Sequence, residues 1–261
     1  MSDLGKDEKS PFTETLVPSG FGGQLKDLPS DKDKIIREVD FGLMDTNDLV
    51  GEMSLYKGLV GELNSKYGIK TPKIELVIGR SDQPRDPIFK RKSSVVYAVT
   101  DRIKGVNFED LKIENSEVPL MHEKMETLIS NILFYIKDKS SQESDFLGDI
   151  YGLYQFMYGR VDGEPEDQFY LVDVDPGFVF HNATKHNIRR FASYLVYLVE
   201  DLGEAEKKLG GERLLQARKN INDFFNTIAS SDSYFKKLQE VRARMNQGNF
   251  DYRDILNEII D

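Results

Sequence analysis

Three polar residues in the second half of the chain stand in an order that could hold a metal ion beside a phosphate. Asp173 directly follows the apolar run of residues 168–172, while Asp149 and Gln155 precede that run. An acid in a loop, an amide at the start of one strand and an acid at the end of the paired strand can converge on one point. Hard oxygen ligands of this kind suit magnesium, which usually keeps waters and shares substrate phosphate oxygens. The order predicts a magnesium site in which Asp173 faces a phosphate.

Asp175 follows two residues later and is open to two interpretations. It is either a second metal ligand or a cap of the loop that begins at Pro176. A single acid after a strand is a common turn former, so the metal hypothesis depends on the whole set.

A glycine-rich turn near the start of the chain is a candidate for phosphate binding. A hairpin is predicted over residues 12–28, and its turn carries Gly20, Gly22 and Gly23. Glycine has no side chain to keep a phosphate away from the backbone. A plain hairpin turn would show the same pattern, so the signal is weak alone.

The strand predicted over residues 33–41 carries basic residues that could reach such a phosphate. Successive side chains of a strand point to opposite faces, so Arg37 and Lys34 lie on different faces. Arg37 fits the inner face better, and Lys34 is the alternative. Glu52, in a predicted helix over residues 48–67, could pair with the basic residue, although a surface glutamate is the simpler interpretation.

Composition excludes several classes of function. The chain of 261 residues contains no cysteine, which excludes disulfides, thiolate metal sites and a cysteine nucleophile. A net charge of −10 argues against broad nucleic-acid binding, which needs a basic surface. The first residues lack the apolar core of a signal peptide, and no run is long enough to span a membrane. We expect a soluble, cytoplasmic protein without nucleic-acid or membrane partners.

The pattern of elements changes once along the chain. Before residue 104 it predicts mostly antiparallel strands and one helix, and beyond it a long amphipathic helix (118–136), a strand pair and several further helices. The helices expected near the C-terminal end cover residues 188–202, 214–228, 234–245 and 252–260. We predict an α+β fold with a flexible segment at 1–11, a smaller β-rich lobe at 12–103 and a larger, mostly helical lobe at 104–261.

This order of elements resembles the protein-kinase-like fold, and within it the aminoglycoside phosphotransferase branch. The segments that carry the resemblance are GIKTPKIELVIG, VVYAVTDRIKGVNFEDL, DFLGDIYGLYQFMYG and YLVDVDP. They resemble, in turn, the approach to the fourth strand, the hinge between the lobes, the catalytic loop and the metal-binding exit. The resemblance covers about residues 13–200.

The resemblance implies transfer of the γ-phosphate of ATP to a hydroxyl group of a small molecule or protein, with Mg2+ as the second cofactor. Asp149 would orient and deprotonate the acceptor hydroxyl, and Glu52 would brace the basic residue of the third strand. Gln155 and Asp173 would hold the magnesium ion. The hinge backbone at residues 99–103 would bind adenine, with contacts at Thr100, Asp101 and Ile103.

Three departures from the family pattern keep other functions open. The family's usual histidine before the catalytic aspartate is absent, and LGD (147–149) stands there. Tyr154 stands at the expected metal-binding asparagine, and the third-strand lysine is replaced if Arg37 takes its role. The first alternative is therefore a pseudokinase, a catalytically inactive nucleotide-binding or protein-interaction module. A nucleotide-sugar transferase that uses the DVD run as a metal-binding pair is the second alternative, although the elements do not alternate as an α/β sheet requires.

Overall fold

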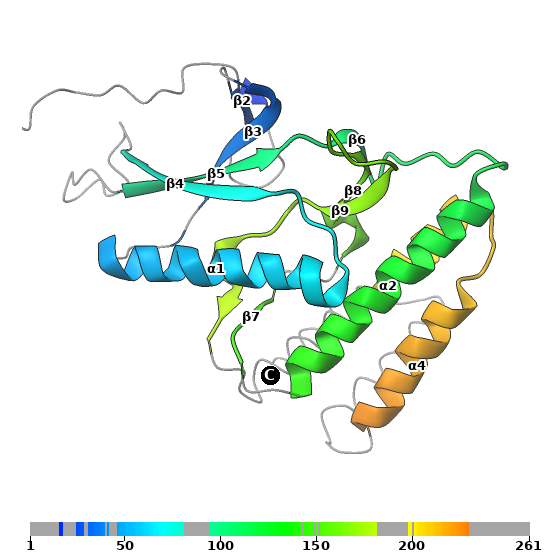
Figure 1. The fold of residues 1–261 in the computed structure, drawn as a ribbon. Coiled ribbons are helices and arrows are strands. Elements are labelled where there is room, and N and C mark those ends of the chain that lie inside the picture. Colours follow the sequence, from blue (N-terminus) through cyan, green and yellow to red (C-terminus); the bar gives the residue numbers. More distant parts are fainter. Residues whose placement is uncertain are drawn as a thin grey trace, which may run out of the picture.

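The computed structural model describes residues 16–17, 25–28, 31–39, 41, 46–80, 94–141, 144–148, 150, 152–181, 198–199 and 201–229. The fold is α+β, with small antiparallel sheets and helices (Figure 1). Five strands form the first sheet in the order β1-β2-β3-β5-β4. Their bounds are Leu16–Val17 (β1), Leu25–Leu28 (β2), Asp31–Val39 (β3), Ile74–Arg80 (β4) and Ser94–Asp101 (β5).

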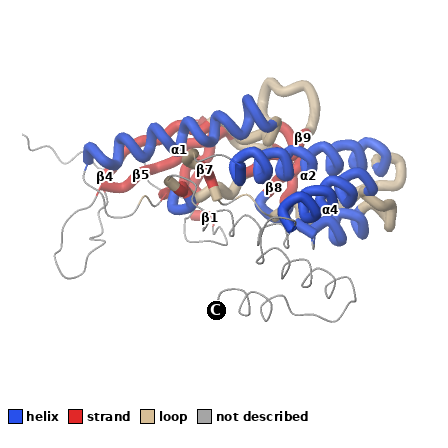
Figure 2. The backbone as a smooth tube through the Cα atoms, turned by 90° about the horizontal axis from the view of Figure 1, so that it is seen from below, coloured by secondary structure: helices blue, strands red, loops and turns tan. Residues whose placement is uncertain are grey.

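Helix α1 (Thr46–Tyr67) connects β3 to β4 and lies along one face of this sheet (Figures 1 and 2). Its apolar residues recur at helical spacing, and the buried ones are Leu49, Tyr56, Leu59, Val60, Leu63 and Tyr67. Asp48 in the first turn and Lys66 in the last turn both complement the helix dipole. The helix ends at Gly68, whose φ of 68° is a left-handed conformation that glycine adopts without strain.

The second half of the chain supplies a three-stranded sheet and the long helices. Strands β6 (Lys104–Asn107), β8 (Phe156–Arg160) and β9 (Gln168–Leu171) pair in the order β6-β8-β9. Helix α2 (Val118–Ser141) packs beside α4 (Leu215–Ala229), as Figures 1 and 2 show. Residues 198–199 and 201–208 are also helical. The buried apolar side chains of α1, α2, α4 and the strands form one continuous core.

Two short strands bring distant loops together. Strand β7 (Phe146–Leu147) pairs with β10 (Val179–Phe180) in antiparallel register, with Leu147 opposite Val179. Gly148 N donates to Phe178 O at 2.8 Å and extends the contact beyond the strands. The loop after β7 and the loop after β9 therefore leave the core next to each other.

The structure differs from the sequence-based expectation mainly at short elements. Strands β6 and β10 were not expected, because KGVN is polar and exposed and a two-residue strand carries no periodicity. Strand β6 lies at the predicted lobe boundary and pairs with β8, so it belongs with the second sheet. The segment at 1–11 and the helices expected at 234–245 and 252–260 lie outside the described residues, and the division into two lobes stays a prediction.

No helix in the described part of the chain is long and apolar enough to cross a membrane. The expectation that the protein has no membrane-spanning helix agrees with this finding.

Candidate functional site

Arg37 connects the first sheet to the segment that follows β9. Its Nη1 lies 3.2 Å from Asp173 Oδ1, and its Nη2 donates to Val174 O at 2.5 Å. Arg37 and Asp173 are 136 residues apart in the chain. The Arg37 side chain is 19% exposed, whereas that of Asp173 is 43% exposed. The guanidinium therefore lies mostly inside, and the carboxylate at the end of β9 still faces solvent.

Tyr56 of α1 completes this junction. Its hydroxyl donates to Val174 O at 3.0 Å, so the same carbonyl accepts from β3 and from α1. Tyr56 is fully buried and packs edge-on against Phe41. Helix α1, strand β3 and the segment after β9 consequently meet at one carbonyl, next to the Asp173 carboxylate. Sequence analysis missed Tyr56, and its place on the apolar stripe of α1 was the only signal for it.

Lys34 and Arg37, the two basic candidates on β3, have different partners, as the alternation of side chains along a strand predicts. Lys34 lies 3.8 Å from Glu75 of β4 and takes no part in the Asp173 junction. Arg37 is therefore the basic residue of β3 that reaches the predicted site.

Glu52 does not contact Arg37 in this structure. Its Oε2 lies 3.4 Å from Nε2 of His181, which directly follows β10. The predicted brace between Glu52 and Arg37 is thus replaced by two separate pairs, Arg37 with Asp173 and Glu52 with His181. The helix was placed correctly, but its partner comes from a segment whose return beside α1 depends on the β7–β10 pairing.

Gln155 is buried and its amide binds the backbone at both ends. Its Oε1 accepts from Gly152 N at 3.1 Å, and its Nε2 donates to Asp173 O at 3.2 Å. In addition, Val172 N donates to Gln155 O at 3.0 Å. The residue is 2% exposed and closes a 3-10 turn over Leu153–Gln155. Gln155 and Asp173 are brought together as predicted, but the amide pins the segment after β9 instead of facing solvent.

Asp175 is a cap of the loop that begins at Pro176, the second of the two roles considered for it. Its Oδ1 accepts from Gly177 N at 2.8 Å and caps the short 3-10 turn Pro176–Phe178. The acid therefore stabilises the loop after Asp173.

Asp149 and the three glycines at positions 20, 22 and 23 lie outside the described residues. The residues on either side of Asp149 are described, and Gly148 and Ile150 are both buried. A side chain at Gly148 would lie 2.1 Å from the Phe180 ring, which explains why the position before Asp149 is a glycine.

The predicted hinge residues lie at the end of β5. Thr100 pairs with Ile35 and Ile74 in the sheet, and Asp101 N donates to Lys73 O at 3.3 Å. Arg102 N donates to Asp33 O at 2.7 Å. The hinge backbone is thus tied to β3 and to the approach to β4, and Ile103 follows, half-buried.

Asp201 is a further residue that sequence analysis did not single out. Its Oδ2 accepts from Leu153 N at 2.6 Å and anchors the 3-10 turn that contains Gln155. A lone aspartate in a helical pattern carries no sequence signal for such a contact over 48 residues.

The described residues fit magnesium only in part. Asp173 has an exposed carboxylate, and magnesium is often held by one or two carboxylates together with substrate phosphates and waters. Gln155 does not fit, because its side chain is buried and bound to backbone groups. Among the described residues, no group of three or more histidine or acidic side chains could hold a metal ion. Any magnesium site would therefore rely on Asp173 and on the substrate.

The two backbone contacts of the Gln155 side chain predict that this residue contributes to the stability of the fold. Gln155→Asn shortens the side chain by one methylene, so it cannot keep both backbone contacts, and a buried polar group left without a partner costs about 1–3 kcal/mol. We expect urea denaturation to show a loss of that size in the free energy of unfolding. Gln216→Asn, on an exposed position of α4, is the matched control and should stay within about 0.5 kcal/mol of wild type. Unchanged stability in Gln155→Asn, with altered magnesium dependence of nucleotide binding, would contradict the pinning role.

Comparison with known proteins gives a limited result. No family model matches the chain, and no curated protein matches it. Among solved structures, the chain is similar to a microcompartment-associated aminopropanol kinase, with 10% sequence identity and a TM-score of 0.38. The match covers 94% of this chain and 87% of that chain. So loose a superposition does not establish a common fold.

Proposed function

We propose that the protein has a two-lobed kinase-like fold and transfers the γ-phosphate of ATP to a hydroxyl group of a small molecule or protein. The observation that carries the proposal is the junction of Arg37, Asp173 and Tyr56. It joins a basic residue of the third strand, an acid after a late strand and the helix between β3 and β4. Kinases use a third-strand basic residue and an acid of this kind to hold the phosphates and the metal ion.

The connections of the elements support the same proposal. Helix α1 follows β3 and precedes β4, as does the helix that carries the bracing glutamate in kinases. The β7–β10 pair sets residues 146–147, which lead to Asp149, beside residues 179–180, which follow the segment of Asp173. Transfer to a hydroxyl requires a general base close to the residues that bind the phosphates. The β7–β10 pairing would bring Asp149 close to Asp173 in this way.

Each chain residue would act on the nucleotide by charge or by position. Arg37 would donate to phosphate oxygens, for which its guanidinium must share or release the Asp173 carboxylate. Asp173 would then hold the magnesium ion, which neutralises phosphate charge when bound. Asp149 would orient the acceptor hydroxyl and accept its proton. Asp101 N and Arg102 N already donate to backbone oxygens, so adenine would bind from Ile103 onward.

A pseudokinase is the second candidate, and Gln155 favours it. The side chain nearest the family's metal-binding amide is buried and bound to the backbone, so one metal ligand is missing among the described residues. Such a protein would bind nucleotide at Arg37 and Asp173 but would not transfer phosphate.

Thermal denaturation with ligands tests the proposal. We expect millimolar Mg-ATP to stabilise the protein, by about 2.7 kcal/mol when ATP is present at 100 times its dissociation constant. A uridine-sugar nucleotide with manganese is the control, because it would stabilise a nucleotide-sugar transferase instead. A melting temperature that Mg-ATP leaves unchanged would contradict both the phosphotransferase and the nucleotide-binding alternative.

A further inference from the structure

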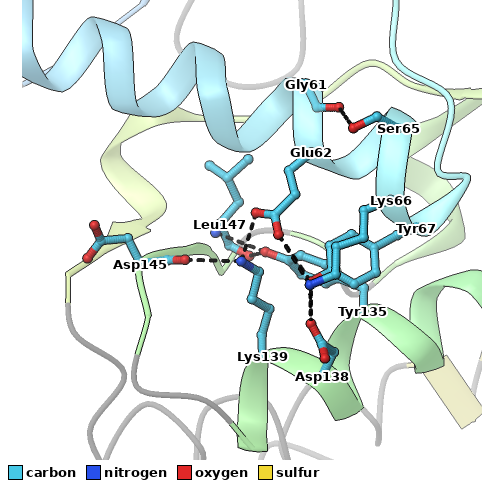
Figure 3. Close-up of polar contacts among 10 residues, drawn as sticks. All are labelled: Gly61, Glu62, Ser65, Lys66, Tyr67, Tyr135, Asp138, Lys139, Asp145 and Leu147. Atoms are coloured by element: carbon cyan, nitrogen blue, oxygen red, sulfur yellow. Dashed lines mark hydrogen bonds and ion pairs between the residues drawn. The ribbon is translucent and has the colours of Figure 1, made fainter.

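The segment just before Asp149 is held by a polar cluster that lies away from the Arg37 junction. The cluster consists of Glu62, Lys66 and Tyr67 of α1 and of Tyr135, Asp138 and Lys139 of α2 (Figure 3). It connects the C-terminal half of α1 to the C-terminal half of α2 and to residues 145–147. The phosphotransferase proposal does not use any of these six residues.

Lys139 is the centre of the cluster. It is 3% exposed, and its Nζ donates to Glu62 Oε2 at 2.8 Å and to Asp145 O at 3.3 Å. A buried ammonium group is costly unless it is paired and hydrogen-bonded, and Lys139 meets both conditions. One side chain of α2 therefore links α1 to the backbone that leads into β7, as Figure 3 shows.

Tyr135 fixes the next residues of the same segment. Its buried hydroxyl donates to Leu147 O at 2.7 Å and accepts from Leu147 N at 2.9 Å. Leu147 is fully buried and lies two residues before Asp149. Both hydrogen-bonding groups of the Leu147 backbone are thus bound to one side chain of α2, in addition to the pairing of β7 with β10.

The outer part of the cluster is organised around Asp138. Its Oδ2 accepts from Lys66 Nζ at 2.7 Å and from the Tyr67 hydroxyl at 2.6 Å. The hydrogen bond from Lys66, followed by that from Tyr67, lowers the pKa of Asp138 below its ordinary value. Lys66 is 42% exposed and contacts no residue of the 145–147 segment, so it belongs to the α1–α2 contact alone.

We infer that Glu62, Tyr135 and Lys139 are positioning residues that hold residues 144–148, the segment that leads into the loop of Asp149, in place relative to α1. Helix α1 binds the segment after β9 directly, through Tyr56 and Val174 O, and it is linked to the segment before Asp149 through Lys139. A displacement of α1 would move both segments together. The role of the loop in catalysis rests on the proposed function, whereas its attachment to α1 does not.

Hydrogen–deuterium exchange of residues 144–148 tests this inference in the full chain. Lys139→Met removes the link to α1, and Tyr135→Phe removes one oxygen atom and keeps the ring. Each lost backbone bond should raise amide exchange in 144–148 by about 5–10-fold, while exchange in β5 stays unchanged. The controls are Lys66→Met, in the outer part of the cluster, and Tyr170→Phe, which removes the hydroxyl of a buried tyrosine of β9. Both controls should leave exchange in 144–148 within about 2-fold of wild type.

A kinetic readout separates positioning from general stability. If the wild type turns over ATP, Tyr135→Phe should lower kcat by about 10²-fold with KM for ATP unchanged, because a small misplacement of a catalytic group has that effect. Unchanged exchange in both Lys139→Met and Tyr135→Phe, or an equal rise in β5, would overturn the inference. If the two variants exchange faster in 144–148 but the wild type binds no nucleotide, the positioning role is supported and the phosphotransferase proposal is overturned.

Discussion

Asp149→Asn is expected to lower the rate of phosphoryl transfer by about 10²–10⁴-fold while the affinity for ATP stays unchanged. Asparagine keeps the size of the side chain but cannot accept the proton of the acceptor hydroxyl. The flanking residues Gly148 and Ile150 are buried, and Gly148 N is bound to Phe178 O, so the loop itself should keep its path. ADP release measured in a coupled assay gives the rate, and calorimetric titration gives the affinity.

The control for this variant is Glu164→Gln, an exposed acid in the turn between β8 and β9, which should transfer phosphate at the wild-type rate. If no acceptor is known, slow hydrolysis of ATP can stand in for transfer. Equal turnover in Asp149→Asn and wild type would contradict the role of Asp149 as the base. A wild type that binds ATP and never turns it over would favour the pseudokinase.

Arg37→Met is expected to weaken ATP binding by about 10–100-fold. A hydrogen bond to a charged group contributes about 1.5–3 kcal/mol, and the variant also leaves Asp173 without its cationic partner near the phosphates. Lys34→Met is the matched control, because it removes a basic side chain that pairs with Glu75 and not with Asp173. Titration calorimetry with Mg-ATP on both variants measures the difference.

The opposite result for this pair would be informative as well. A larger loss of affinity in Lys34→Met than in Arg37→Met would move the phosphate site to the other face of β3. The junction at Val174 would then be a structural contact between the sheet and the segment after β9.

The residues that sequence analysis placed well are those governed by regular periodicity. Alternation along β3 predicted that Arg37 and Lys34 point to different faces, and the structure confirms it through their separate partners. The apolar spacing of α1 and α2 likewise predicted two long helices close to their observed bounds. Periodicity works here because both patterns record which face of an element is buried.

The residues that sequence analysis placed less well depend on single turns and on distant segments. The order of Gln155 and Asp173 correctly predicted that they meet, but the 3-10 turn at Leu153–Gln155 directs the amide to the backbone. Glu52 meets His181 because β10 returns beside β7, and two-residue strands leave no pattern to detect. Lys139 lies three residues beyond the helix predicted over 118–136, and only the approach of α1 shows that it is buried.

A crystal structure with magnesium and a non-hydrolysable ATP analogue tests the central claim most directly. The account predicts phosphates beside the Arg37 guanidinium, the Asp173 carboxylate turned to the metal ion, and adenine against the backbone from Ile103 onward. An analogue bound elsewhere, with Arg37 still paired to Asp173 and Val174, would contradict it.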